Sequence, residues 1–322
     1  MQHTNRIVAF VALGLAALCA GTLGASALCA EALADESAIR IGAIDAVLTT
    51  PSDIDKPPVA VLIAGSGSID HDGNGPQIKP ATLKKLSEQL VARGIATLRY
   101  DKRGAGGWKP EFGRPEDFRF KDYVDDAAAL VDYLRGSGKF SRIVLVGHSE
   151  GGLVAILAAR KVPVDRLVLL ATAARRQGDL LKAQLEKRLA PDQLAAVAKA
   201  IDAIMAGDIV DPTPPGLPIP RAMQPGIASA FVEDPIVPLK LILRPLLIVA
   251  GGQDHQIARL DFVALSTAAA AAKTAWIPAM NHILVDVSDD DDDLASYNQP
   301  ERPLDSSLIE AVAGFINDNP AR

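Results

Sequence analysis

The residues best suited to chemistry in this chain are a serine and the two glycines that flank it. Gly147-His148-Ser149-Glu150-Gly151 has the pattern Gly-x-Ser-x-Gly, which occurs where a strand turns sharply into a helix with the serine at its tip. Residues 143–146 are typical of such a strand, and residues 152–157 are typical of the helix. Ser149 is therefore the candidate nucleophile, and an ordinary serine in a strand-to-helix turn is the alternative interpretation.

A serine hydroxyl is a poor nucleophile near neutral pH and needs a base beside it. His282 follows the last predicted strand, at residues 274–277, and is the candidate base. His148 lies inside the serine motif and is expected to point away from Ser149. The remaining histidines, none of them favoured as the base, are His3, His71 and His255.

The third catalytic residue should be a carboxylate that orients the imidazole and stabilises its charged form. Asp254 follows the apolar residues 246–252, again at the carboxyl end of a predicted strand. Ser149, Asp254 and His282 then occur in the order serine, aspartate, histidine, as in hydrolases with this serine motif. The alternative is that Asp254 only caps a helix beginning near Ile257.

An oxyanion hole needs two backbone N–H groups directed at the developing negative charge. Glu150, the residue after the nucleophile, is expected to supply one of them. The glycine-rich loop at residues 64–68 is expected to supply the other, with Ser66 the first choice and Gly65 the second. A phosphate-binding loop is disfavoured, because no glycine-lysine-serine or G-x-G-x-x-G pattern is present.

Strand and helix patterns alternate along the chain and must position these residues. The predicted strands cover residues 58–64, 95–100, 142–146, 166–170, 245–250 and 273–277, and the predicted helices cover 82–93, 122–134, 151–160, 257–272 and 304–316. This alternation predicts an α/β fold with a mostly parallel sheet flanked by helices. The candidate residues all follow strands, so they should meet at the carboxyl edge of the sheet.

Several motifs together resemble a family of bacterial serine esterases with the α/β-hydrolase fold. The matching segments are residues 62–67, 70–74, 93–104 and 147–152, which include the runs Gly-Ser-Gly, Asp-His-Asp-Gly-Asn and Gly-His-Ser-Glu-Gly-Gly. The resemblance covers the chain from about residue 58 to the last helix. It implies carboxylesterase activity on short acyl esters, with Ser149, Asp254 and His282 as the catalytic triad. The alternatives are a peptidase, thioesterase, lactonase or acyltransferase with the same triad, or an inactive hydrolase-like binding protein.

The predicted domains are a signal peptide at 1–34, a hydrolase core at 35–174 and 244–322, and a helical cap inserted at 175–243. The insertion is too long for a simple crossover. It contains two amphipathic stretches, at 180–189 and 194–205, and then a proline-rich segment.

The first residues have the features of a secretory signal. Arg6 precedes an apolar run at 7–20, and Ala32-Leu33-Ala34 is the favoured cleavage site, with Ala25-Ser26-Ala27 second. Cleavage would remove both cysteines of the chain and leave no stable membrane insertion. The expected location is the bacterial periplasm or the medium. A retained anchor and a lipoprotein are the less favoured alternatives.

The expected partner is the small-molecule ester that the resemblance implies. The 322 residues carry a net charge of −6, which gives no reason to expect nucleic acid or an anionic membrane surface. We expect neither a cofactor nor a metal. The acidic run at 289–293 lacks the interleaved glycine of a calcium loop and is predicted to be a solvated, mobile loop. Trp276 is predicted to be in the core, and Trp108 to border the active site.

Overall fold

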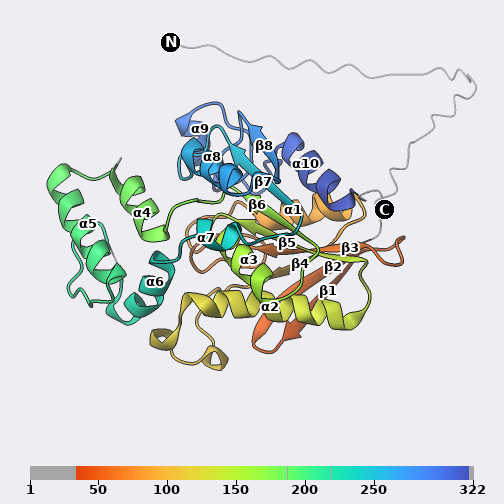
Figure 1. Ribbon diagram of the computed structural model, residues 1–322, viewed down its shortest axis with the longest axis horizontal. Coiled ribbons are helices and arrows are strands. Elements are labelled where there is room, and N and C mark those ends of the chain that lie inside the picture. Colours follow the sequence, from red (N-terminus) through yellow and green to blue (C-terminus); the bar gives the residue numbers. More distant parts are fainter. Residues whose placement is uncertain (1–33, 187, 218, 319–322) are drawn as a thin grey trace, which may run out of the picture. The chain divides into compact units, whose positions relative to one another are not determined.

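The computed structural model describes residues 34–186, 188–217 and 219–318 of the chain. The predicted signal peptide lies outside these residues, apart from Ala34. The described residues form one eight-stranded sheet with the strand order β1-β2-β4-β3-β5-β6-β7-β8 (Figure 1). Its strands are β1 (Ala34–Ile41), β2 (Ile44–Pro51), β3 (Pro58–Ile63), β4 (Ala96–Tyr100), β5 (Arg142–His148), β6 (Arg166–Leu170), β7 (Leu246–Gly251) and β8 (Lys273–Ile277).

Strands β3 to β8 are parallel, whereas β1 and β2 add an antiparallel hairpin at one edge. The parallel strands and their α/β alternation are as predicted. The hairpin was not predicted. In β1 most side chains are exposed, because an edge strand with a polar sequence buries little surface. Such a strand lacks the apolar pattern that made the others recognisable.

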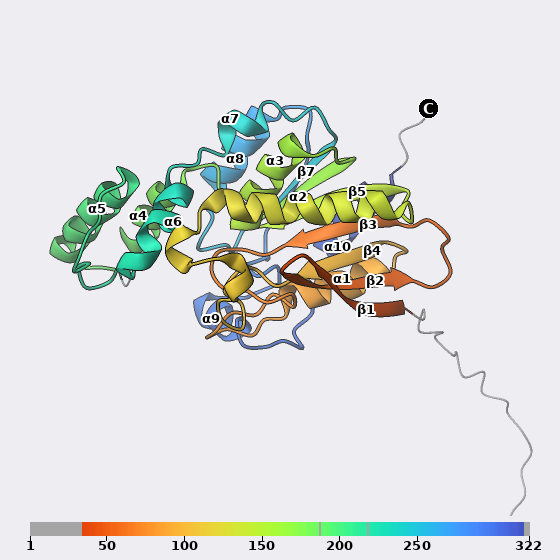
Figure 2. The same cartoon turned by 90° about the horizontal axis from the view of Figure 1, so that it is seen from below.

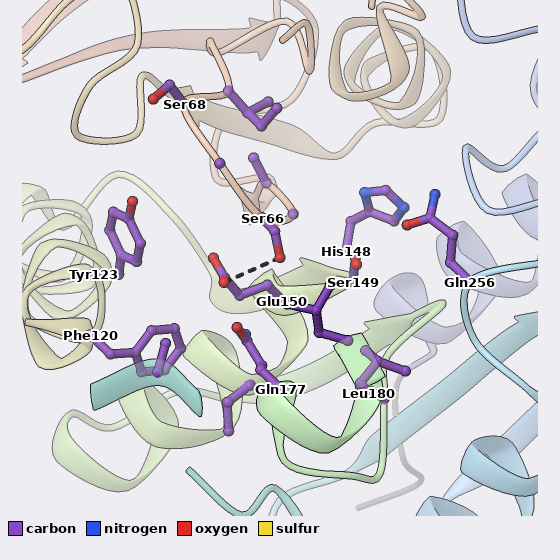
Figure 3. A pocket seen from close by; sticks show the side chains of 18 of the residues that line it. Ser66, Ser68, Phe120, Tyr123, His148, Ser149, Glu150, Gln177, Leu180 and Gln256 are labelled. Carbon is purple, nitrogen blue, oxygen red and sulfur yellow. Dashed lines mark hydrogen bonds between the residues drawn. The ribbon is translucent and has the colours of Figure 1, made fainter. Parts of the chain in front are cut away.

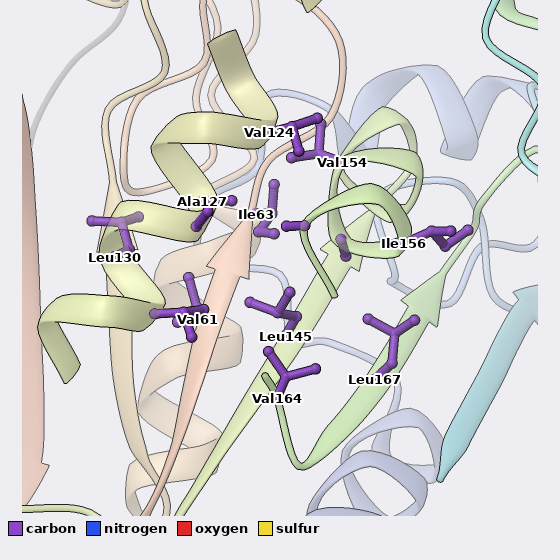
Figure 4. Close-up of a cluster of buried hydrophobic side chains, with 14 of the residues drawn as sticks. Val61, Ile63, Val124, Ala127, Leu130, Leu145, Val154, Ile156, Val164 and Leu167 are labelled. Atoms are coloured by element: carbon purple, nitrogen blue, oxygen red, sulfur yellow. The ribbon is translucent and has the colours of Figure 1, made fainter. Parts of the chain in front are cut away.

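Helices cover both faces of the sheet (Figure 2). The flanking helices are α1 (Thr82–Val91), α2 (Phe120–Ser137), α3 (Glu150–Lys161), α8 (Arg259–Ala268) and α10 (Ser306–Asn317). Alternate residues of each strand point to opposite faces. In β3, for example, Val61 and Ile63 pack with α2 and α3 (Figure 4), whereas Ala60 and Leu62 pack with α1 and α10. Two apolar layers of this kind fix the strand register and therefore the position of each strand's end.

Between β6 and β7 the chain forms a helical segment that lies beyond one end of the sheet (Figures 1 and 2). Its helices are α4 (Gln177–Glu186), α5 (Pro191–Met205), η3 (Arg221–Met223), α6 (Gln224–Phe231) and α7 (Ile236–Leu239). This segment has an apolar cluster of its own, centred on Val197, Ile201 and Ile204 of α5 and Phe231 of α6. Burying that surface within the segment lets α5 extend away from the sheet, whereas Ala230 of α6 and Leu239 of α7 pack in the main core.

Two smaller expectations are corrected by the structure. Trp276 is only partly buried and packs against Phe262 of α8, because β8 is the edge strand of the sheet. The predicted helix at 257–272 is shorter and begins at Arg259. Among the described residues, no helix is both long and apolar enough to cross a membrane.

Candidate active site

Ser149 lies at the turn between β5 and α3, with a backbone φ of 55°. Such a positive φ is strained for a residue with a side chain, and close packing maintains it. A Cβ added at Gly147 would lie 2.2 Å from the backbone oxygen of Gly151, and one added at Gly151 would lie 2.2 Å from that of Ile63. The flanking glycines are therefore required where the strand, the turn and the helix touch.

The three predicted catalytic side chains are brought together. Nε2 of His282 lies 3.1 Å from Oγ of Ser149, and Nδ1 of His282 lies 2.9 Å from Oδ2 of Asp254. The histidine and aspartate side chains are almost completely buried. Ser149 is separated in sequence from His282 by 133 residues, so only the folded sheet creates this contact. The arrangement can pass a proton from the serine hydroxyl to the imidazole.

Asp254 contacts both His282 and the turn before α8, but it does not cap that helix, whose N-cap is Ala258. Its Oδ1 accepts hydrogen bonds from the backbone N–H groups of Gln256 and Ile257, each at 2.8 Å, while Oδ2 faces His282. Burial alone would raise the pKa of this carboxyl. The charge of His282 and the hydrogen bonds from the imidazole and the two N–H groups nevertheless hold its pKa below the ordinary value. Asp254 is therefore a fixed negative charge at neutral pH.

His148 was expected from its place in the motif to point away from Ser149. In the structure its ring lies beside His282. Its ring centroid is 5.1 Å from that of His282, and its Nε2 donates a hydrogen bond of 2.8 Å to the backbone oxygen of His282. Burial and the charge of His282 lower the pKa of His148 to about 4. His148 is thus a neutral donor that holds the backbone of the base. Its proximity depends on the loop after β8, which the motif alone does not place.

The buried neutral state of His148 predicts a pH dependence of stability. The pKa of His148 falls from 6.5 in the unfolded chain to about 4 in the folded protein. Below pH 6.5 His148 is protonated in the unfolded chain but stays neutral in the folded protein, so stability is lost as the pH falls toward 4. The advantage of wild type over His148→Gln should shrink by about 3 kcal/mol across this window. Denaturant unfolding of both proteins at several pH values measures it, and a constant difference would contradict the assignment.

The acidic run at 289–293 is ordered, contrary to the prediction of a mobile loop. It forms the start of α9 (Asp290–Ser296), where Asp289 accepts from the N–H of Asp292 as the N-cap. Carboxylates are favoured at a helix N-terminus, which explains the acidic sequence. Asp293 accepts a hydrogen bond of 2.7 Å from the side chain of Asn281. The run therefore holds the residue immediately before His282.

The loop after β3 lies against the nucleophile. A Cβ added at Gly65 would be 3.2 Å from Cβ of Ser149, a tight contact that glycine avoids. The backbone N–H groups of Ser66 and Glu150 have no acceptor among the described residues. Both predicted oxyanion-hole donors are thus free N–H groups beside Ser149.

Charged and polar contacts fix the remainder of this loop. Asp70 accepts from the N–H groups of Asp72 and Asn74 within a tight turn, and the ring of His71 is 2.7 Å from Asp101. Arg99 reaches across from β4 to pair with Asp72. Arg99 and Asp101, at the end of β4, therefore anchor this loop through Asp72 and His71.

A cavity of about 560 Å³ opens beside Ser149, between the sheet and the helical segment (Figure 3). Phe120 and Tyr123 of α2 line one side, and Leu180 of α4 closes another. Trp108 also borders this cavity, as predicted. Among the described residues that line it, the only carboxylate is that of Glu150, which is paired with Lys102. The cavity is suited to neutral, largely apolar ligands.

Comparison with known proteins finds similarity to hydrolases. Residues 79–237 match the family described as serine aminopeptidase, S33. Esterase EstD of Thermotoga maritima is 27% identical over 229 residues, which is 70% of this chain and 54% of EstD. Human serine hydrolase BPHL is 34% identical over 99 residues, 31% of this chain and 28% of BPHL. The chain thus spans about half, or less, of the length of these curated relatives.

Solved structures show the same fold. Est1E of Butyrivibrio proteoclasticus, with bound ferulic acid, has a TM-score of 0.55 and 22% identity, covering 86% of this chain and 99% of Est1E. A hydrolase from Pseudomonas aeruginosa has a TM-score of 0.52 and 21% identity, covering 88% and 98% of the two chains. The protein therefore has the α/β-hydrolase fold, and its sequence is similar to esterases and serine hydrolases.

Proposed function

We propose that the protein is a serine hydrolase that cleaves carboxylic esters through an acyl-enzyme on Ser149. The observation that carries the proposal is the continuous contact from Ser149 through His282 to Asp254, with separations of 3.1 and 2.9 Å. The similarity to EstD supports an ester as the substrate class.

In the first half of the reaction, His282 accepts the hydroxyl proton of Ser149 while the serine oxygen attacks the ester carbonyl. The N–H groups of Ser66 and Glu150 stabilise the tetrahedral oxyanion. The intermediate collapses, the bond to the alcohol oxygen breaks, and His282 donates its proton to that oxygen. In the second half, water loses a proton to His282 and attacks the acyl carbon, and Ser149 leaves with that proton.

The helical segment at 175–243 is proposed to be a cap over the acyl site. Leu180 of α4 and Phe231 of α6 line the cavity opposite the catalytic residues. A volume of about 560 Å³ is in the range that holds drug-sized ligands. Short acyl esters fit this space without filling it, so longer acyl groups should gain from it.

Aminopeptidase activity is the alternative raised by the family match. A peptidase that selects a free amino terminus needs an unpaired carboxylate or carbonyl group to bind the ammonium. Among the described lining residues the only carboxylate, Glu150, is 2.7 Å from Nζ of Lys102 and already neutralised. This observation favours an ester over an aminopeptide, and nothing in the cavity separately favours a thioester, a lactone or acyl transfer.

A substrate panel tests the proposal. Wild type is expected to hydrolyse p-nitrophenyl acetate and butyrate, with kcat/KM rising about threefold to fourfold for each added methylene that the cavity buries. Aminoacyl p-nitroanilides and acyl thioesters of equal length should be cleaved more slowly. Faster cleavage of the anilides would overturn the ester assignment. Failure of a fluorophosphonate probe to label Ser149 would instead indicate an inactive binding protein.

The cap is tested by blocking the cavity. Leu180→Trp should shorten the longest accepted acyl chain while leaving acetate hydrolysis within about threefold of wild type. Leu243→Trp is the matched control, because Leu243 is 94% exposed and should leave the whole profile unchanged. An unaltered acyl-length profile in Leu180→Trp would show that α4 does not line the acyl site.

A further inference from the structure

An ion pair is buried beneath the proposed oxyanion hole. Nζ of Lys102, in the loop after β4, lies 2.7 Å from Oε1 of Glu150, and the two side chains are only 1% and 8% exposed. Burial would lower the pKa of the ammonium and raise that of the carboxyl. Their mutual attraction reverses both shifts, so the pKa of Lys102 lies above its ordinary value and that of Glu150 below. Both groups are charged at neutral pH.

This pair connects the two chain segments that carry the oxyanion donors. Nζ of Lys102 also donates a hydrogen bond of 2.6 Å to the backbone oxygen of Gly65. The Ser66 hydroxyl donates to Oε2 of Glu150 at 3.2 Å (Figure 3). The loop after β3 and the first residue of α3 are therefore fastened to each other through Lys102 and Glu150.

The bond to Gly65 has an electronic consequence. The carbonyl of Gly65 and the N–H of Ser66 belong to the same peptide group. An ammonium on the carbonyl oxygen draws electron density from the peptide nitrogen, which makes the N–H a stronger donor. Lys102 thus contacts one end of the peptide whose other end is the proposed oxyanion donor.

The donors of Lys102 are all directed at the protein. An ammonium has three N–H groups. Two of them face Gly65 and Glu150, and Nζ lies 4.2 Å from the ring centroid of Tyr123, which takes the third direction. Lys102 therefore has no N–H left to donate to a substrate, and it acts through Gly65 and Glu150.

Resting on the proposed function, we propose that Lys102 is a positioning residue of the oxyanion hole. It holds the Ser66 and Glu150 N–H groups in place and polarises the Gly65–Ser66 peptide toward the oxyanion. The other role open to a buried ion pair is structural, to join two segments without effect on the chemical step. The two roles differ in whether transition-state affinity or only stability changes.

The test is the double variant Lys102→Met/Glu150→Gln, which removes both charges and leaves no buried ion unpaired. We expect kcat for p-nitrophenyl butyrate to fall about 10- to 100-fold, less than for loss of a whole donor, with KM within about threefold of wild type. The inhibition constant of an alkyl trifluoromethyl ketone, which forms a tetrahedral oxyanion on Ser149, should rise by a similar factor. A folded double variant with wild-type kcat and inhibition would overturn the inference, as would a rise in KM alone.

The matched control is Arg99→Met/Asp72→Asn. It removes another ion pair at the end of β4, in which Arg99 is buried and Asp72 is 29% exposed, and which contacts neither Gly65 nor Glu150. We expect a loss of stability with kcat within about threefold of wild type. A loss of kcat equal to that of the Lys102 double variant would mean that any ion pair here has the same effect, and would overturn the specific role of Lys102.

A conservative variant keeps the inference testable if the double variant does not fold. Lys102→Gln/Glu150→Gln retains an N–H donor for Gly65 and leaves no buried ion unpaired, so its kcat should lie between that of wild type and a tenth of it. A kcat equal to that of wild type would overturn the inference. Failure of the proposed function is distinguishable, because it would appear as absent esterase activity in wild type or as full activity in Ser149→Ala.

Discussion

Ser149→Ala is expected to lower kcat/KM for p-nitrophenyl butyrate by at least about 10⁴-fold, the scale seen when a serine nucleophile is removed. The methyl group cannot form the acyl-enzyme, and His282 is left without a proton to accept. Steady-state hydrolysis at substrate concentrations well below KM, with the concentration of wild-type active sites set by fluorophosphonate titration, measures the loss.

The fold should not change in this variant. Oγ of Ser149 bonds to His282 and to no other described group, and alanine can keep the backbone at the turn. Thermal unfolding should therefore remain within about 3 °C of wild type, a shift that corresponds to less than about 1 kcal/mol. Ser266→Ala in α8 is a matched control, since that hydroxyl bonds only to the backbone oxygen of Phe262. If Ser149→Ala kept more than a few per cent of wild-type activity, Ser149 would not be the nucleophile.

Asp254→Asn should lower kcat about 10⁴-fold. With the amide oxygen kept at the turn, the NH2 group faces Nδ1 of His282 and cannot accept its N–H, so the imidazole is held in the wrong tautomer. The remaining amide oxygen can still accept from the N–H groups of Gln256 and Ile257, so the turn should persist. Activity measured beside unfolding free energy separates the two roles of the residue.

Asp254→Ala further separates the effect of Asp254 on activity from its effect on stability. This variant loses the bonds to the turn as well as the contact to His282, so it should also be less stable, by about 1 kcal/mol. Two outcomes would show that Asp254 only caps the turn: full activity in Asp254→Asn, or an activity loss in Asp254→Ala that merely follows the fraction unfolded. The pKa of Asp254 lies below the ordinary carboxyl value, so the loss of its charge at low pH should occur only in strongly acidic solution.

The proposals for Ser149 and Lys102 concern different roles in the same step. Ser149 supplies the electron pair, whereas Lys102 acts on the peptide whose N–H stabilises the oxyanion. A loss of activity confined to kcat in the Lys102 double variant, together with complete loss in Ser149→Ala, would fit both proposals.

The positions of the parallel strands and of the catalytic side chains at their ends were predictable from sequence. Buried strands such as β5 are short apolar runs, and helices such as α1 bury residues three to four positions apart. Chain order then places Ser149, Asp254 and His282 after successive strands. The periodicity of neighbouring residues predicts each strand and helix. Their alternation along the chain predicts the parallel sheet and thus where the three residues lie.

The hairpin at the edge and the helix made by the acidic run were not predictable in this way. Strand β1 is mostly exposed, so its sequence carries no buried face. The acidic residues of α9 are ordered by the N-cap at Asp289 and by the side chain of Asn281, and neither contact is visible in the composition of the run.

By itself the sequence determined the fold class, the nucleophile motif and the order of the candidate triad, because these depend on residues close together or on chain order. Only the tertiary structure decided that His148 lies against the backbone of His282, and that Lys102 joins Gly65 to Glu150. These contacts join residues 37 to 134 positions apart. Their partners are selected by the packing of loops at the sheet edge, which no local pattern encodes.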